Sequence, residues 1–328
     1  MADFHDIVGH EQLIEHMKHA IQMKKVSHAY LIQGDYDSGK KMIATVFAKT
    51  LQCEKKGNEP CNQCTSCMQV DSGNHPDIIY VSHEKPASIG IDDVRLQING
   101  SIQVKPYSSE YKVYIVDEAE KMTTEAQNAI LKTMEEPPAY AIIILLVTNI
   151  GKILPTILSR CVLLQIKPVQ DEKIKKHLLS LGIEEEKADF STSFAMGNVG
   201  KAIKVATSEE FQSIKNDCIQ LLKSVKNMEV YELITKSKEL VQYKLQVYDY
   251  LDFILMWYRD ILMVKATRNA NNLIYQEEYR ALKESATRSS YEGIQTIIEE
   301  IERAKVRLYA NVNFELAMEL LWLAIKEN

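Results

Sequence analysis

The hydrophobic residues follow different patterns in the two halves of the chain. In the first half they form short apolar runs, which are typical of strands buried on both faces of a parallel sheet. These runs lie within residues 29–32, 75–82, 113–116, 141–147 and 162–166. From residue 209 onward, apolar residues recur at helical spacing without the Gly-rich turns of strands. The pattern therefore predicts an α/β domain with a parallel sheet, followed by an all-helical region.

Three further segments complete the expected elements. Residues 4–26 and 92–102 have the periodicity of helices, and residues 168–208 read as a small helical unit. Residues 268–276, RNANNLIYQ, break the helical pattern and predict a loop.

One predicted strand, Val113–Val116, ends at the three carboxylates Asp117, Glu118 and Glu120. Ligands of open α/β sheets bind at this carboxyl edge. The acidic strand end is similar to a Walker B element, where one carboxylate holds Mg²⁺ and its neighbour polarises the attacking water. The alternative is an acidic strand end that is simply solvated. Further nucleotide-binding motifs elsewhere in the sequence would distinguish the two interpretations.

A helix and a second strand follow directly. Thr124 and Gln127 have the spacing of a capping box, and Pro137 ends the helical pattern. The next apolar run, Ala141–Val147, leads to Asn149. Strand, acidic turn, helix and strand in this order indicate part of a doubly wound sheet.

A Gly-rich loop joins the first predicted strand to a helix. Gly34, Gly39 and Lys40 fit the phosphate-binding pattern G-x-x-x-x-G-K in its strand–loop–helix context. Lys41 departs from it, because a Ser or Thr hydroxyl that ligates Mg²⁺ is expected there, and an ammonium offers no acceptor. The loop can still hold phosphate, but we expect Mg²⁺-dependent hydrolysis to be badly impaired. A purely structural Gly turn is the alternative.

Four of the six cysteines cluster directly after this helix. Cys53, Cys61, Cys64 and Cys67 have the spacing C-x7-C-x2-C-x2-C. Four thiolates around one ion form a closed, structural Zn²⁺ site with no open catalytic position. An iron–sulfur cluster is the alternative, and the absence of a further nearby cysteine favours zinc.

An arginine follows the last strand connection. Pro155 starts a short predicted helix that ends near Arg160, just before the strand at residues 162–166. A guanidinium there can reach phosphates on an adjacent subunit as an arginine finger in trans. A surface salt bridge is the competing interpretation.

Composition and charge narrow the class of protein. The chain has 328 residues, 46% hydrophobic and 26% charged, which suits a globular protein of two or three domains. Its formal net charge of −6 argues against a surface that grips nucleic acid everywhere, and favours protein partners. The N-terminal residues show no basic and apolar signal pattern, and Ala141–Val147 is the longest apolar run. We therefore expect a cytoplasmic protein without a membrane contact.

These motifs, in this order, resemble the delta-prime subunits of the bacterial DNA polymerase III clamp loader, within the AAA+ superfamily. The resemblance rests on HAYLIQG, GDYDSGKK, the cysteine insert, NHPDI, DEAEKM, NAILKTMEEPP and LPTILSRC, and covers essentially the whole chain. It implies an AAA+ P-loop domain with a five-stranded parallel sheet at residues 1–167, carrying the zinc insert at 53–67. A helical lid at 168–208 and a helical collar for oligomerisation at 209–328 follow.

The resemblance also implies residue roles. The Walker A place is taken by Gly34, Gly39, Lys40 and Lys41, and the Walker B place by Asp117 and Glu118. Asn149 corresponds to the first sensor, Arg160 to the arginine finger, and Lys201 lies near the place of the second sensor. The zinc module corresponds to Cys53, Cys61, Cys64 and Cys67. Lys41 and Asp37 depart from an active loop. They fit a subunit that no longer hydrolyses ATP but acts within a DNA-directed DNA polymerase holoenzyme.

The implied partners are the motor and delta subunits of the loader, the sliding clamp and primed DNA. Zn²⁺ is the implied cofactor, and ATP binding stays open. Alternatives are an active ATPase motor subunit of the same loader, a zinc protein that binds nucleic acid itself, and an AAA+ subunit of a DNA-repair assembly.

Overall fold

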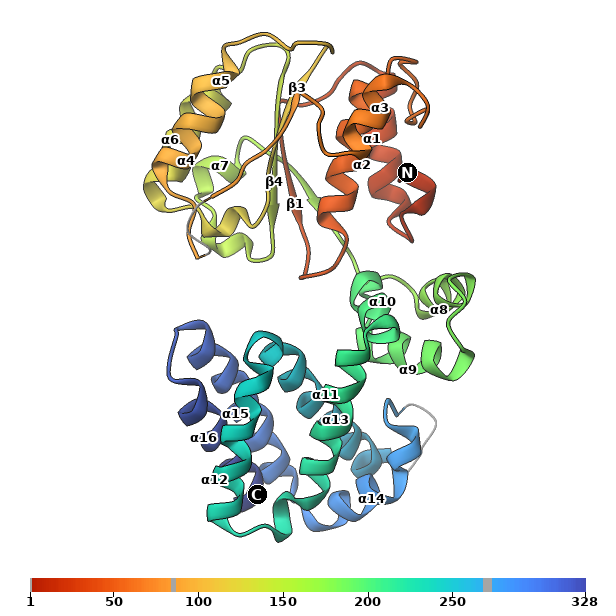
Figure 1. The fold of residues 1–328 in the computed structure, drawn as a ribbon, viewed down its shortest axis with the longest axis vertical. Helices are drawn as coiled ribbons and strands as arrows, with labels where there is room; N and C mark the ends of the chain where they lie inside the picture. Colours follow the sequence, from red (N-terminus) through yellow and green to blue (C-terminus); the bar gives the residue numbers. More distant parts are fainter. Residues whose placement is uncertain (1, 84–86, 268–272) are drawn as a thin grey trace. The chain divides into compact units, whose positions relative to one another are not determined.

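The computed structural model describes residues 2–83, 87–267 and 273–328. Cα packing divides the chain into two compact units (Figure 1). The first comprises Met1–Gly182 and Ala195–Ala202, and the second comprises Ile183–Phe194 and Ile203–Asn328.

A five-stranded parallel sheet forms the centre of the first unit. Its strands are β1 (Ala29–Gln33), β2 (Ile78–Tyr80), β3 (Lys112–Val116), β4 (Ala141–Val147) and β5 (Val162–Gln165), in the order β2-β3-β4-β1-β5. Leu31 of β1 pairs with Leu145 of β4 and Leu163 of β5. The predicted fold class, an α/β domain with a five-stranded parallel sheet followed by a helical region, is confirmed.

Helices cover both faces of this sheet (Figure 1). One face packs against α1 (Glu11–Gln22), α2 (Lys40–Gln52) and α3 (Thr65–Asp71), and the other against α4 (Ile91–Val94), α5 (Gly100–Ile102), α6 (Thr124–Glu135) and α7 (Pro155–Leu158). Ile142, Ile144 and Leu146 of β4 enter the first core, while its alternate residues enter the second. Burial on both sides explains why β4 is apolar throughout.

Short helical turns complete this unit. They are η1 (Phe4–Asp6), the π-helical η2 (Arg95–Asn99), η3 (Ala119–Lys121) and η4 (Ile150–Lys152). The helix expected at residues 92–102 is continuous through α4, η2 and α5.

The start of α6 differs by one residue from the predicted capping box. Thr123, not Thr124, is the N-cap, and its hydroxyl accepts from the Ala126 N–H at 3.2 Å. Gln127 is buried and bridges elsewhere: its amide donates to the Lys152 carbonyl and accepts from the Leu154 N–H. The prediction of a Thr124–Gln127 box was wrong because the helix begins one residue earlier, which places Ala126 at the third helical position, where it cannot close a box.

The region expected as a lid contains α8 (Asp171–Ser180), α9 (Glu185–Ala195) and α10 (Val199–Thr207). The sheet unit takes α8 and the first turn of α10, whereas most of α9 belongs to the second unit. A separate lid domain at 168–208 therefore stays a prediction, as does the collar at 209–328.

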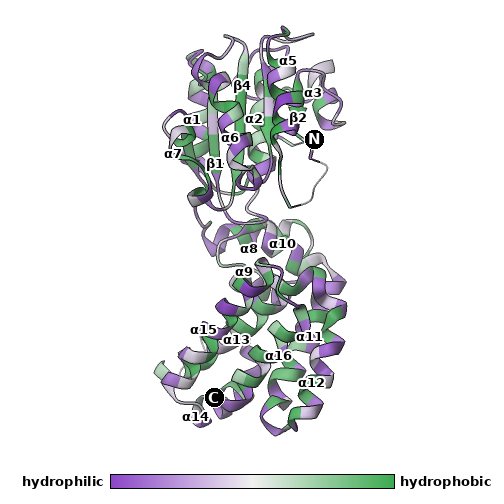
Figure 2. Ribbon diagram, turned by 90° about the vertical axis from the view of Figure 1, so that its left-hand side faces the viewer, coloured by the Kyte–Doolittle hydropathy of each residue, from purple (hydrophilic) through white to green (hydrophobic). Residues whose placement is uncertain are grey.

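The second unit is helical. Its longer helices are α11 (Glu209–Ser224), α12 (Val230–Glu239), α13 (Val247–Thr267), α14 (Tyr279–Arg288), α15 (Tyr291–Tyr309) and α16 (Phe314–Glu327), with short turns η5 (Val225–Asn227), η6 (Leu240–Gln246) and η7 (Gln276–Glu278). Apolar and polar residues alternate along these helices, as Figure 2 shows. Phe194, Phe211 and Phe253 form one aromatic cluster of the core, and Tyr250 packs on Trp322.

The loop predicted at 268–276 lies partly outside the described residues, which resume at Leu273. Ile274 and Tyr275 are buried, and their N–H groups donate to the buried carboxylate of Asp260 at 2.7 and 2.8 Å. Burial raises the pKa of that carboxyl group.

Across the described part of the chain, no helix is long and apolar enough to cross a membrane.

Candidate functional sites

The Gly-rich loop lies between β1 and α2, at the carboxyl edge of the sheet. Gly39 takes a left-handed conformation with φ of 86° and precedes the first turn of α2. Asp37, where glycine is common in such loops, also has a positive φ of 59°. A non-Gly residue rarely adopts this conformation, so surrounding contacts must hold the loop.

Lys40 is turned back onto the loop. Its ammonium donates to the carbonyls of Gly34 and Asp35 at 2.8 and 2.6 Å. Burial lowers its pKa, while the carboxylates of Glu120 and Asp117 act in the opposite direction. The charge that would meet a phosphate is therefore held by backbone of the same loop.

Lys41 lies at the place of the expected Mg²⁺ ligand. Its Nζ is 3.5 Å from Oδ2 of Asp117, the carboxylate that would hold the metal. The two side chains are 64% and 42% exposed. A fixed cation thus pairs with the acidic group that a divalent cation would need.

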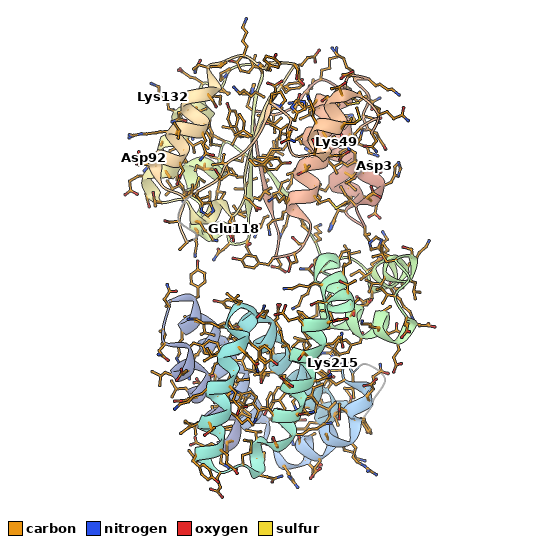
Figure 3. The ribbon with its side chains drawn as sticks, in the orientation of Figure 1. Asp3, Lys49, Asp92, Glu118, Lys132 and Lys215 are labelled. Atoms are coloured by element: carbon orange, nitrogen blue, oxygen red, sulfur yellow. The ribbon has the colours of Figure 1, made fainter. Side chains whose placement is uncertain are left out.

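The other acidic residues of this strand end also have partners in the chain. Glu118 lies at the lower edge of the sheet in Figure 3, with φ of 50°, and its carboxylate accepts from Lys121 at 2.6 Å. Glu120 is buried, and its Oε1 accepts from the Thr148 N–H at 3.2 Å. Asn149 uses its side chain to accept from the Gly151 N–H at 2.9 Å. These residues lie near one another but are engaged in local structure.

Two cavities lie near the Gly-rich loop and the segment that follows β5. A cavity of about 40 Å³ is lined by His10, Asp35, Ser38, Ile166, Lys167, Pro168, Met196, Gly197, Asn198 and Val199. Ligand pockets for molecules of nucleotide size enclose about 300 Å³ or more. A separate cavity of about 280 Å³ lies between residues 9–13 and 165–173.

Residues 197–200 occupy the space over the loop, a contact that the sequence did not indicate. The Asn198 amide donates to the Tyr36 carbonyl at 2.7 Å. A Cβ on Gly200 would lie 2.1 Å from the Asp37 carbonyl oxygen, so only glycine permits this approach. Lys201, expected near the second sensor, donates through its backbone N–H to the Asn198 side chain. Gly197 and Gly200 are the only signal of this contact in the sequence, because glycines often mark a close approach of two backbone segments.

Arg160 follows α7 and is oriented by three contacts. Nη1 donates to the Thr156 carbonyl at 2.9 Å and to Oγ of Ser159 at 3.3 Å. Nη2 donates to Oε1 of Glu135 at 2.7 Å. The ion pair expected from the alternative interpretation is present, yet it leaves the arginine side chain 35% exposed. Glu135 was not singled out from the sequence, although a carboxylate in the last position of a helix is unfavourable without a partner.

The four predicted cysteines converge. Their Sγ atoms lie within 4.8 Å of one another, and no other such group of metal-binding residues occurs in the described ranges. Cys53 ends α2, Cys64 caps α3, and Cys67 lies inside α3. Asn62, with φ of 56°, makes the tight turn after Cys61.

This geometry suits a tetrahedral ion. Around Zn²⁺, with Zn–S of about 2.3 Å, the sulfurs are about 3.8 Å apart. Backbone N–H groups already donate to three sulfurs at 3.3–3.4 Å, from Cys61 to Cys53, from Cys64 to Cys61 and from Cys67 to Cys64. The backbone N–H of Gln63 contributes most to lowering the pKa of Cys61 to about 6, which favours the thiolate that a metal requires.

Charged and polar contacts tie this cysteine module to the sheet unit. Lys49 of α2, labelled in Figure 3, is 1% exposed and pairs with Asp71 at the end of α3 at 2.7 Å. His75 lies before β2 and is buried, with Nε2 at 3.0 Å from Oγ of Ser66. The helices that carry the cysteines are therefore fixed independently of an ion.

Comparisons with known proteins agree with this architecture. A family described as "DNA polymerase III, delta subunit" matches residues 9–170, and its C-terminal family matches residues 208–327. DNA polymerase III subunit delta' of Bacillus subtilis is 30% identical over 312 residues, 94% of this chain and 93% of that protein. Subunit tau of the same organism is 28% identical over 343 residues, 96% of this chain and 60% of tau.

The fold of the whole chain also has a solved relative. A gamma subunit-related protein of DNA polymerase III from Thermotoga maritima superimposes with a TM-score of 0.54 at 21% identity, covering 96% of this chain and 99% of that one. At this identity the likeness concerns the fold alone. The match to the delta' subunit along nearly its whole length shows that the chain belongs to the delta-prime family of DNA polymerase III subunits.

Proposed function

We propose that this chain acts in the cytoplasm as a clamp-loader subunit of DNA polymerase III that does not hydrolyse ATP itself. It supplies Arg160 to ATP bound by a neighbouring motor subunit. The family membership supports the assembly, and the geometry of the Gly-rich loop supports the division of labour.

The observation that carries the proposal is the Lys41–Asp117 pair. Phosphoryl transfer by P-loop proteins needs Mg²⁺ between a loop hydroxyl and a Walker B carboxylate. Here an ammonium replaces the hydroxyl and sits 3.5 Å from the carboxylate, so metal binding would require breaking an ion pair and placing two cations together. Residues 197–200 also fill the space over the loop.

Arg160 has the chemistry of an arginine finger. A guanidinium that contacts the transferred γ-phosphoryl group offsets its charge in the transition state. Ser159-Arg160-Cys161 lies on the surface of the sheet unit, where a second subunit has access to it. Hydrolysis in the neighbour then drives release of the sliding clamp onto primed DNA.

The cysteine module would hold one Zn²⁺ through Cys53, Cys61, Cys64 and Cys67. When bound, the ion supplies a structural cross-link with no open position for a substrate. The four sulfurs close a loop of the chain between α2 and α3, so its role is to order the residues between them.

The helical second unit offers surfaces for the motor and delta subunits. Helices α13, α15 and α16 pack on one another, and they and the α15–α16 connection carry several exposed large apolar residues: Tyr248, Val306, Tyr309, Val312, Leu316 and Leu320. Contiguous exposed apolar patches mark protein–protein interaction sites, and a patch of these residues would suit one. This supports the collar as the oligomerising part.

Calorimetry on the purified chain tests the proposal. ATP, with and without Mg²⁺, is expected to give no saturable heat, and the chain alone no phosphate release. Mg²⁺-dependent turnover would instead support the alternative of an active motor subunit. Tight binding of primed DNA by the isolated chain, with a steep salt dependence, would support the zinc-dependent nucleic-acid protein.

A further inference from the structure

Glu135 holds Arg160 from a different element. It is the last residue of α6, and its Oε1 accepts from Nη2 of Arg160 at 2.7 Å. The remaining contacts of the guanidinium, with Thr156 and Ser159, come from its own turn. We propose that Glu135 is a positioning residue, which orients Arg160 toward the phosphate of ATP in the neighbouring subunit; this rests on the proposed function.

The contacts of Arg160 use only part of the hydrogen-bonding capacity of the guanidinium. Nη1 donates to two oxygens, of Thr156 and Ser159, and Nη2 donates once, to Glu135. Nε–H and the second N–H of Nη2 have no hydrogen-bond acceptor among the residues that the structure describes. Both donors stay available to the oxygens of a phosphate on the neighbouring subunit.

The location of Glu135 has no other evident benefit to the fold. A carboxylate at the C-terminus of a helix meets the negative end of the helix dipole and destabilises that end. Pro137 and Pro138 already stop α6, so no side chain is needed to end it. The cation of Arg160 offsets this repulsion, which accounts for an acidic residue at this position.

Orientation matters because arginine is flexible. A free guanidinium samples many rotamers, and fixing it anew in each catalytic cycle lowers the rate of the step that needs it. Glu135 and the Thr156 carbonyl fix the group before the neighbour binds. Losing one anchor should therefore lower kcat and leave the affinity for ATP almost unchanged.

The experiment measures the steady-state ATPase of the assembled loader, with clamp and primed DNA, containing wild-type chain or one of several variants. Glu135→Ala removes the anchor, Glu135→Gln keeps the acceptor oxygen, and Glu136→Ala changes the adjacent exposed glutamate as a matched control. Arg160→Ala defines the share of the rate that depends on the finger. The double variant E135A/R160A tests whether Glu135 acts through Arg160.

We expect E135A to remove at least about half of the Arg160-dependent rate, with KM for ATP unchanged, and E135Q to restore most of it. E136A should equal wild type, and E135A should add nothing to R160A. The inference is overturned if the E135A and E136A loaders have the same ATPase rate while R160A lowers it. It is also overturned if E135A raises the rate, because Glu135 would then hold Arg160 away from the phosphate. If R160A itself changes nothing, the proposed function fails together with it.

Discussion

At the scale of single residues, two adjacent lysines set the character of the Gly-rich loop. Lys40 donates to the carbonyls of Gly34 and Asp35, and Lys41 pairs with Asp117. Each ammonium is thus satisfied by oxygens of the chain itself. A loop that satisfies its own cations has less to gain from a phosphate or a metal ion, because each existing contact must first be given up.

Replacing Lys41 with Thr tests whether this residue alone accounts for the inactive loop. K41T supplies the missing hydroxyl, yet we expect no ATPase from the isolated chain, because residues 197–200 still occupy the space over the loop. Stability should change by less than about 1 kcal/mol, since the lost ion pair is exposed. Phosphate release and thermal unfolding are the measurements, with K41A as the control. Mg²⁺-dependent turnover by K41T would show that the hydroxyl was the only missing part.

At the scale of elements, α2 and α3 act as a frame for the cysteine module. The buried Lys49–Asp71 pair joins the two helices, and His75 connects α3 to the segment before β2. Burial lowers the pKa of His75, so this group favours the neutral form in the folded chain. The packing of α2 against α3 brings the four sulfurs together, so an ion would bind a site whose ligands are already close to one another.

Removing the ion should therefore destabilise the chain without unfolding the sheet unit. We expect a strong chelator, or Cys64→Ser, to abolish stoichiometric zinc and lower the unfolding temperature, while far-ultraviolet circular dichroism keeps its helical signal. Cys161→Ala is the matched control, because Cys161 lies outside the cluster and partial burial raises the pKa of its thiol to about 12. Zinc is measured by elemental analysis of protein purified without added metal. Iron in place of zinc, or full zinc content in C64S, would contradict the assignment.

At the scale of the whole molecule, the sequence predicted what depends on local patterns. Continuous apolar runs revealed all five strands, and the spacing of cysteines revealed a cluster whose sulfurs do converge. Contacts between distant segments were not predictable, because a single sequence carries no record of pairing. The hydrogen bond from Asn198 to Tyr36 joins residues 162 positions apart in the sequence. The bond from Arg160 to Glu135 joins the turn after α7 to the end of α6. The departure at Lys41 was visible in the sequence, but its ion pair with Asp117 could be identified only from the folded sheet.

The central claim is that this subunit contributes one guanidinium to ATP hydrolysis by a neighbour and performs no hydrolysis itself. The ATPase rate of the assembled loader with Arg160→Ala tests it most directly, with Arg160→Lys to separate charge from the planar fork. Both variants should assemble as wild type does, because Arg160 is a surface residue, and both should lower the clamp- and DNA-stimulated rate. An unchanged rate in a fully assembled R160A loader would contradict the account.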